Sequence, residues 1–102
     1  MTTLIAHAGL TGPDIEALVV AGGFGSHIRL ASAERIGLIP PGFAAKARTI
    51  GNGAGMGAAM ILLSERVRMD SERIRDLAEV VELSTNPKFM EDYVEGMFFP
   101  AV

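Results

Sequence analysis

The fold is decided by the stretch Leu18-Val19-Val20-Ala21-Gly22-Gly23-Phe24-Gly25-Ser26. Its first four residues form a continuous apolar run rich in β-branched side chains, which is typical of a strand buried on both faces in a parallel sheet. Three glycines then surround one aromatic residue, and glycine lets the backbone turn sharply and approach a ligand closely. Because ligands of open α/β sheets bind outside the carboxyl ends of the strands, the stretch predicts a strand followed by a ligand-binding turn.

A second glycine cluster, residues 51–57, repeats this arrangement further along the chain. Ala47–Ile50, just before it, is a weaker candidate strand. After it, apolar residues recur at helical spacing, which predicts a helix from Ala54 that either Ser64 or Asp70 divides in two.

Neither cluster is a complete dinucleotide or P-loop signature. The first has Ile28 where the pattern G-x-G-x-x-G requires glycine. Residues 53–58 satisfy G-x-G-x-x-A, but no acidic residue ends a following strand as ribose binding requires, and no Lys-Ser/Thr pair completes a P-loop. A purely structural interpretation therefore stays open, in which the glycines of residues 53–57 permit tight turns and close packing of helix on strand.

The remaining pattern completes an α/β order with few strands. The other expected elements are helices at Met1–Gly9 and Ala31–Ile36, a short third strand at Glu82–Ser84, and a last helix opened by Asn86 and Pro87. We expect a single domain over residues 1–102, with parallel strands flanked by helices. Two good strands make a poor free-standing sheet, so Leu18–Ala21 is predicted to be the central strand of a larger one.

Composition limits the function classes. The net charge is −3 with both signs mixed along the chain, which argues against nucleic-acid binding. The chain has no cysteine, so it holds no disulfide and no Cys-ligated iron–sulfur cluster. His7 and His27 have no obvious third ligand for zinc. The longest apolar run, Ala54–Leu63, is too short for a membrane span and the first ten residues do not form a signal peptide, so we expect a cytoplasmic protein. The six methionines are expected to fill the core.

Residues 18–26 resemble the adenosine motif of the actin-like ATPase superfamily. The continuation is more specific. Ala31–Leu38 followed by Pro40 resembles the SA-x-RIGL-x-P stretch in the C-terminal domain of the ATP-dependent reductive activators of corrinoid proteins, and residues 51–58 resemble the GN-x-AG-x-GA segment of the same domain. Further landmarks of that family are Leu62-Leu63-Ser64, Val81-Glu82-Leu83-Ser84-Thr85 and Phe98-Phe99-Pro100. The similarity runs from about Asp14 to the end of the chain.

The resemblance implies that this chain is the C-terminal, nucleotide-binding part of an actin-like ATPase (ribonuclease H-like) domain. Such activators use ATP to reduce an inactive Co(II) corrinoid to Co(I). The residues carried over as ATP contacts are Gly22, Gly23, Phe24, Gly25, Ser26 and, more weakly, Asn52. No catalytic residue and no metal ligand is carried over.

The resemblance places other groups outside this chain. Such activators carry an N-terminal [2Fe–2S] domain, and upstream acidic and Gly/Thr-rich segments hold the phosphates and Mg²⁺. The implied partners are a corrinoid protein and the remainder of the parent chain. Unpaired strand edges also lead us to expect a homo-oligomer, such as a dimer.

Two other function classes stay open at this point. One is a non-catalytic interaction or dimerisation module that docks on a corrinoid protein. The other is a Rossmann-like binder of a dinucleotide. A plant-type C-x₄-C-x₂-C spacing upstream in the coding sequence would favour the activator over both.

Overall fold

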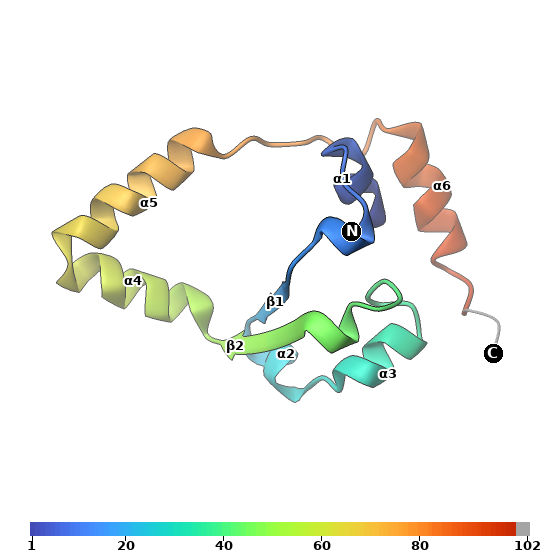
Figure 1. Ribbon diagram of the computed structural model, residues 1–102, viewed down its shortest axis with the longest axis horizontal. Helices are drawn as coiled ribbons and strands as arrows, with labels where there is room; N and C mark the ends of the chain where they lie inside the picture. The colour runs from blue at the N-terminus through green and yellow to red at the C-terminus, as the bar shows by residue number, and fades with distance from the viewer. Residues whose placement is uncertain (100–102) are drawn as a thin grey trace.

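The computed structural model describes residues 1–99, and Pro100 lies outside the described residues. The elements are α1 (Thr2–His7), η1 (Gly12–Asp14), β1 (Leu18–Ala21), α2 (Gly23–His27), α3 (Leu30–Arg35), η2 (Ala44–Lys46), β2 (Ala47–Gly51), α4 (Gly53–Leu63), α5 (Glu65–Leu77) and α6 (Pro87–Glu95), where η denotes a single 3-10 turn. In Figure 1, β1 and β2 lie between the α4–α5 pair on one side and the α1–α6 pair on the other. The predicted α/β order is confirmed; α2, within the glycine-rich turn, was not predicted.

The two strands pair in parallel, as predicted. Their register joins Leu18 to Ala47, Val19 to Arg48, Val20 to Thr49 and Ala21 to Gly51. The last step skips Ile50, which is therefore a bulged residue of β2 at the carboxyl end of the pair. Within residues 1–99 the sheet has these two strands, and the prediction that β1 is the central strand of a larger sheet stays a prediction.

A small core lies beneath the crossover that joins the strands. Its buried apolar residues within the described chain are Ala33 of α3, Ile39 and Phe43, which are 2%, 7% and 4% exposed. Leu18 at the start of β1 and Ile28 after α2 pack against them. The crossover therefore covers one face of the strand pair.

Two polar side chains fix the starts of the strands. The Lys46 Nζ donates hydrogen bonds of 2.6 Å to the carbonyl oxygens of Gly12 and Ile15, which ties the residue before β2 to the segment before β1. The Glu34 carboxylate accepts a hydrogen bond of 2.7 Å from the Ala44 amide. That amide, with a second from Gly42, holds the pKa of Glu34 below its ordinary value. Both contacts serve the fold, because they hold the crossover closed.

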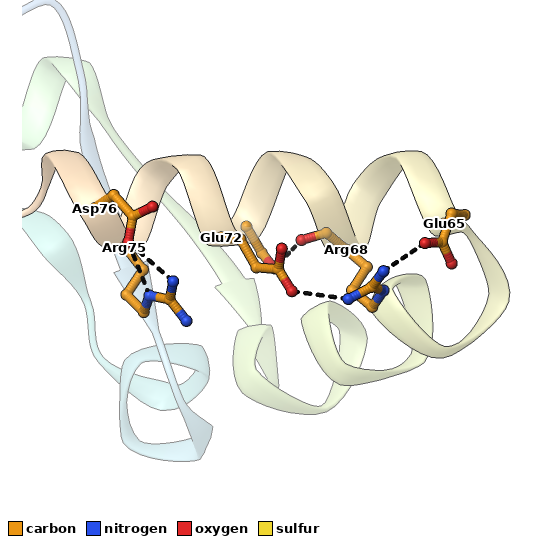
Figure 2. A network of polar contacts seen from close by, with 6 residues as sticks. Glu65, Arg68, Glu72, Arg75 and Asp76 are labelled. Carbon is orange, nitrogen blue, oxygen red and sulfur yellow. Dashed lines mark hydrogen bonds and ion pairs between the residues drawn. The ribbon is translucent and has the colours of Figure 1, made fainter.

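The helices α4 and α5 form a hairpin that extends from the carboxyl end of β2 (Figure 1). Ser64 divides them, as one of the two predicted positions: its Oγ accepts a hydrogen bond of 3.3 Å from the Val67 amide and caps α5. The exposed face of α5 carries the ion pairs Arg68–Glu65, Arg68–Glu72 and Arg75–Asp76 (Figure 2). The two pairs of Arg68 have the i,i+3 and i,i+4 spacing that supports a helix, and solvated pairs of this kind do not indicate a site. None of the helices in residues 1–99 combines the length and hydropathy needed to cross a bilayer.

The last helix returns to the first (Figure 1). Thr3, which is 3% exposed, donates a hydrogen bond of 2.6 Å from its Oγ1 to Asp92 Oδ2. The Lys88 Nζ lies 2.9 Å from Asp92 Oδ1 on the same helix. The predicted cap is confirmed, since the Asn86 Oδ1 accepts hydrogen bonds from the amides of Lys88 and Phe89. Asp92 thus joins α6 to the first turn of α1.

The predicted third strand at Glu82–Ser84 is wrong. Residues 78–86 connect α5 to α6 without forming a strand. The Glu82 Oε1 accepts hydrogen bonds of 3.1 Å from the Ser84 amide and 2.6 Å from the Ser84 hydroxyl, which closes a local turn. A β-prone sequence needs a neighbouring strand, and none lies beside this segment among residues 1–99.

Much of the apolar surface expected in the core is exposed. The exposed fraction of the methionines runs from 50% at Met1 to 64% at Met97, so their interpretation as core residues is wrong within this chain. Leu62 and Leu63, at the end of α4, are 85% and 84% exposed. The radius of gyration is 16.2 Å, whereas a compact domain of this length has about 13 Å. The hairpin and residues 97–99 therefore present apolar side chains that the rest of residues 1–99 does not cover.

Candidate functional site

The candidate site lies where the carboxyl ends of β1 and β2 meet. The Gly22 amide donates a hydrogen bond of 2.6 Å to the Gly51 carbonyl, which ties the two strand ends together. Both residues have positive φ angles, +95° at Gly22 and +66° at Gly51. Side chains rarely tolerate this conformation, so glycine is required at both positions to turn the chain into the helices that follow.

The remaining glycines of the first cluster differ in what surrounds them. A Cβ placed on Gly25 would lie 2.5 Å from Val20 Cγ1, so glycine there lets α2 pack directly on β1. A Cβ on Gly23 would meet nothing within 4 Å, and its φ is not positive. Neither conformation nor packing within the chain explains the glycine at 23. A side chain at position 23 would therefore point into open space.

The other predicted contacts of this turn lie on α2. Phe24 is the second residue of the helix, between Gly23 and Gly25. Ser26 is exposed, and its Oγ donates a hydrogen bond of 3.3 Å to the Gly22 carbonyl. The Ser26 hydroxyl lies 3.8 Å from the position of a Cβ on Gly51, so it faces the junction of the two strand ends. The structure therefore brings Gly22, Gly23 and Ser26 to one place.

Asn52 was predicted as a weaker ATP contact, and the structure shows that its side chain also has a role in the fold. Its Oδ1 accepts a hydrogen bond of 2.9 Å from the Gly55 amide, and the residue caps α4. A Cβ on Gly55 would collide with the Asn52 side chain, and one on Gly53 would lie 2.9 Å from Ile50 Cδ1. The glycines at 53 and 55 are thus explained by helix capping and close packing.

Sequence reasoning missed two residues that shape the junction. Gly51 accepts the hydrogen bond from Gly22, and Ile50 is the bulge that brings these two glycines opposite each other. A glycine directly after a strand-like run was a usable signal for Gly51. The bulge at Ile50 had no signal, because it arises from the register between two strands.

The resemblance implies ATP, Mg²⁺ and a [2Fe–2S] cluster in the parent protein. The open backbone at Gly23 fits a nucleotide, which requires close approach to bare amides. Within residues 1–99, no three His, Cys, Asp or Glu side chains gather in a metal-binding arrangement, and the chain has no cysteine for an iron–sulfur cluster. The carboxyl groups with lowered pKa values include Asp14, Glu34 and Asp92, and each lowering is caused first by a hydrogen bond that holds the fold.

Comparison with known proteins assigns this chain to a family. All residues, 1–102, match the family described as the C-terminal domain of RACo, the ASKHA domain. The chain belongs to this family. The resemblance to the C-terminal domain of corrinoid activators is confirmed, and so is the fold class, because ASKHA domains are actin-like ATPase domains. The Rossmann-like alternative is wrong for an ASKHA domain.

This ASKHA domain is also similar to a curated protein. It is 41% identical over 91 residues to the corrinoid activation enzyme RamQ of Eubacterium limosum, an alignment that covers 89% of this chain. The chain spans 15% of the length of RamQ. The match therefore concerns one portion of a much longer protein.

Proposed function

We propose that this ASKHA domain binds ATP at Gly22–Ser26 and forms the adenosine side of the nucleotide site in a reductive activator of a corrinoid protein. The observation that carries the proposal is the open backbone at Gly23, at the carboxyl ends of two parallel strands. The similarity to a corrinoid activation enzyme supports the choice of reaction.

The residues of this domain would bind and orient the nucleotide. The Gly23 backbone allows close approach, while the Ser26 hydroxyl offers a polar contact at the strand junction. Gly25 and Gly51 act indirectly, since they hold α2 against β1 and turn the chain at the end of β2. ATP hydrolysis supplies the free energy for reducing Co(II) to Co(I).

The groups that perform phosphoryl transfer are proposed to lie elsewhere in the parent protein. Positioning of Mg²⁺ and of the attacking water requires charged groups around the γ-phosphate. The same parent would carry the [2Fe–2S] cluster and contact the corrinoid protein. We also propose that the parent protein is a homo-oligomer, since the exposed apolar faces of this domain require cover. We propose a cytoplasmic location for it.

The test is ATP affinity of the complete protein with Gly23→Val. The added side chain would occupy the open space at Gly23, so we expect the affinity to fall at least tenfold, that is by about 1.4 kcal/mol, while the protein stays folded. The matched control is Gly57→Val, because a Cβ at Gly57 on α4 also meets nothing within 4 Å. Unchanged ATP affinity in a folded Gly23→Val protein would contradict the proposed site.

A second test concerns turnover by the isolated chain. We expect phosphate release from Mg-ATP to equal that of buffer, because a half-site open to water places neither metal nor nucleophile. The positive control is the complete protein with its corrinoid partner. Steady turnover that is lost when residues of this chain are substituted would show that the catalytic groups lie here.

The second candidate function is a non-catalytic interaction or dimerisation module. Its support is the exposed apolar surface of α4, where Leu62 and Leu63 are more than four-fifths exposed. A complete protein that binds its corrinoid partner through this domain but binds no nucleotide would favour this function over the first.

A further inference from the structure

The connection between α5 and α6 contains an extended segment, residues 79–83. It begins after Ala78, whose ψ of 135° is that of extended backbone. Burial alternates along it as in a strand, since Val81 and Leu83 are half-buried whereas Val80 is 94% exposed. In Figure 1 the connection spans the distance between α5 and the α1–α6 pair. The segment therefore has the side-chain pattern of a strand, although no strand lies beside it within residues 1–99.

The backbone of this segment is unpaired. On one side the Ala78 amide donates a hydrogen bond of 2.9 Å to the Ile74 carbonyl, and on the other the Ser84 amide donates to the Glu82 carboxylate at 3.1 Å. Within residues 1–99 the five amides between these two donate no hydrogen bond to another residue. A row of unpaired amides and carbonyls on extended backbone is a template for a further strand.

The segment is complementary to a second copy of itself. Residues 79–83 read Glu-Val-Val-Glu-Leu, so two copies that run antiparallel about Val81 bring the two valines opposite each other. Each glutamate then lies opposite an apolar residue of the other copy, either Leu83 or Val80. No two carboxylates are directly opposite, and β-branched side chains form the centre of the pair.

Charge and hydrogen bonding select this register over its neighbours. A shift of one residue toward α5 places Glu79 opposite Glu82, and like charges directly opposite destabilise a strand pair. A shift of two residues in that direction requires the Ala78 amide, which α5 already uses. A shift toward α6 requires the Ser84 amide, which is held by Glu82. The register centred on Val81 uses all five free amides and avoids both conflicts.

We propose that residues 79–83 pair antiparallel with the same residues of a second copy, and that this pair is the contact of the homo-oligomer. Because each copy contributes the same surface, the contact closes as a dimer. Ile74 and Leu77, on the last turn of α5 beside the segment, are 67% and 79% exposed and extend the apolar contact. The inference rests on the proposed homo-oligomeric state and names its interface.

Cysteine cross-linking tests the register, because the chain of 102 residues has no cysteine of its own. The two Val81 Cα atoms of the proposed pair lie about 4.5–5.5 Å apart, within the range of about 4.4–6.8 Å that a disulfide spans. The two Val80 Cα atoms lie on a diagonal, about 7–8 Å apart. Under mild oxidation we expect Val81→Cys to form the intermolecular disulfide about tenfold faster than Val80→Cys. Exposure alone gives the reverse order, because Val80 is the more exposed residue, and that order would overturn the inference.

Charge substitutions test the contact in the complete protein. Val81→Asp places two carboxylates opposite each other and Val81→Lys two ammonium groups, so each variant should raise the dimer dissociation constant about tenfold in sedimentation equilibrium. An equal mixture of the two variants should restore the dimer, because the aspartate of one copy then faces the lysine of the other. The matched controls are Val94→Asp and Val94→Lys, at a valine of α6 that is 49% exposed and lies outside the segment, and we expect the dimer to be unchanged.

The outcomes separate this inference from the proposed function. A complete protein that is monomeric would overturn the homo-oligomer and the interface together. A dimer that neither Val81 variant weakens, or that the mixture does not restore, would overturn the interface alone. ATP affinity should be unchanged in every Val81 variant, because residues 79–83 lie outside the turn at Gly22–Ser26, so the nucleotide site stands or falls by the Gly23→Val measurement.

Discussion

At the residue scale, glycines of similar sequence context have different physical roles. Gly22 is required for its φ of +95°, and Gly25 because a side chain would strike Val20. Gly23 has neither requirement, and its place at the carboxyl end of β1 is the reason we propose it as a ligand position. The role of each glycine depends on its φ angle and on the atoms that a Cβ would meet. We therefore expect substitutions at Gly22 and Gly25 to affect folding, and substitutions at Gly23 to affect binding.

Gly25→Ala is expected to destabilise the complete protein. The new methyl group would lie 2.5 Å from Val20 Cγ1, and such overpacking costs about 1–3 kcal/mol. The measurement is the apparent melting temperature, with Gly23→Ala as a control that should match the unsubstituted protein. The double variant Val20→Ala/Gly25→Ala should recover part of the loss. Equal melting of the two single variants would contradict the close packing of α2 on β1.

Asp92 makes the contact between α1 and α6 dependent on pH. The hydrogen bond from Thr3, followed by that from Lys88, lowers the pKa of Asp92. A lowered pKa means that the contact is fully stabilising above the ordinary aspartate value of about 3.9 and is lost as pH falls through the lower folded value. Carbon NMR titration of the complete protein should give an Asp92 midpoint below the ordinary value. Thr3→Val should raise the midpoint, and no difference between the two proteins would contradict the contact.

At the element scale, the helices are defined by local caps and the strands by their neighbours. Asn52, Ser64 and Asn86 each cap the helix that follows them, through hydrogen bonds to amides two or three residues along. The segment 78–86 also has a local solution, the turn between Glu82 and Ser84, and it takes this in place of a strand. A helix can form from contacts within one segment, whereas a strand requires a second.

Gly57→Ala is expected to stabilise α4 by about 1 kcal/mol, because alanine loses less conformational freedom in a helix and the Cβ meets nothing within 4 Å. Gly55→Ala is the matched comparison two residues earlier. Its Cβ would collide with Asn52, and loss of that cap costs about 1 kcal/mol, which offsets the gain. Native-state hydrogen exchange of the α4 amides measures both. A larger protection at Gly55→Ala than at Gly57→Ala would show that the Asn52 cap does not stabilise the helix.

At the scale of the whole molecule, the chain is open rather than compact. Its dimensions are 49 × 31 × 23 Å, and the α4–α5 hairpin stands away from the strands with apolar residues on its surface (Figure 1). The apolar character of α4 is spread around the helix, which is typical of a helix buried on all sides in its complete protein. Exposed apolar surface of this extent is of the kind that proteins normally cover with a partner surface.

The isolated chain is expected to self-associate. The unpaired edge of β1 and the exposed apolar faces are surfaces that proteins normally cover. Sedimentation velocity over a hundredfold range of concentration should show a rising average mass. The substitutions Leu62→Glu and Leu63→Glu, at the two most exposed large apolar residues of α4, should shift the transition to higher concentration. A monomer throughout the range would mean that the chain covers these faces itself.

The sequence by itself determined the features that depend on neighbours along the chain. The apolar run before Gly22, the cap at Asn86 and the break at Ser64, one of two predicted positions, were enough to predict β1 and most helices. The motifs at residues 18–26, 31–40 and 51–58 were enough to predict the family. The tertiary structure alone decided which glycine is open, where β2 bulges at Ile50, and that Glu82–Ser84 has no strand beside it. It also decided the role of Asn52, because the same side chain can cap a helix or face a ligand. These properties depend on contacts between segments distant in sequence, and no local pattern encodes the atom that lies opposite a given residue.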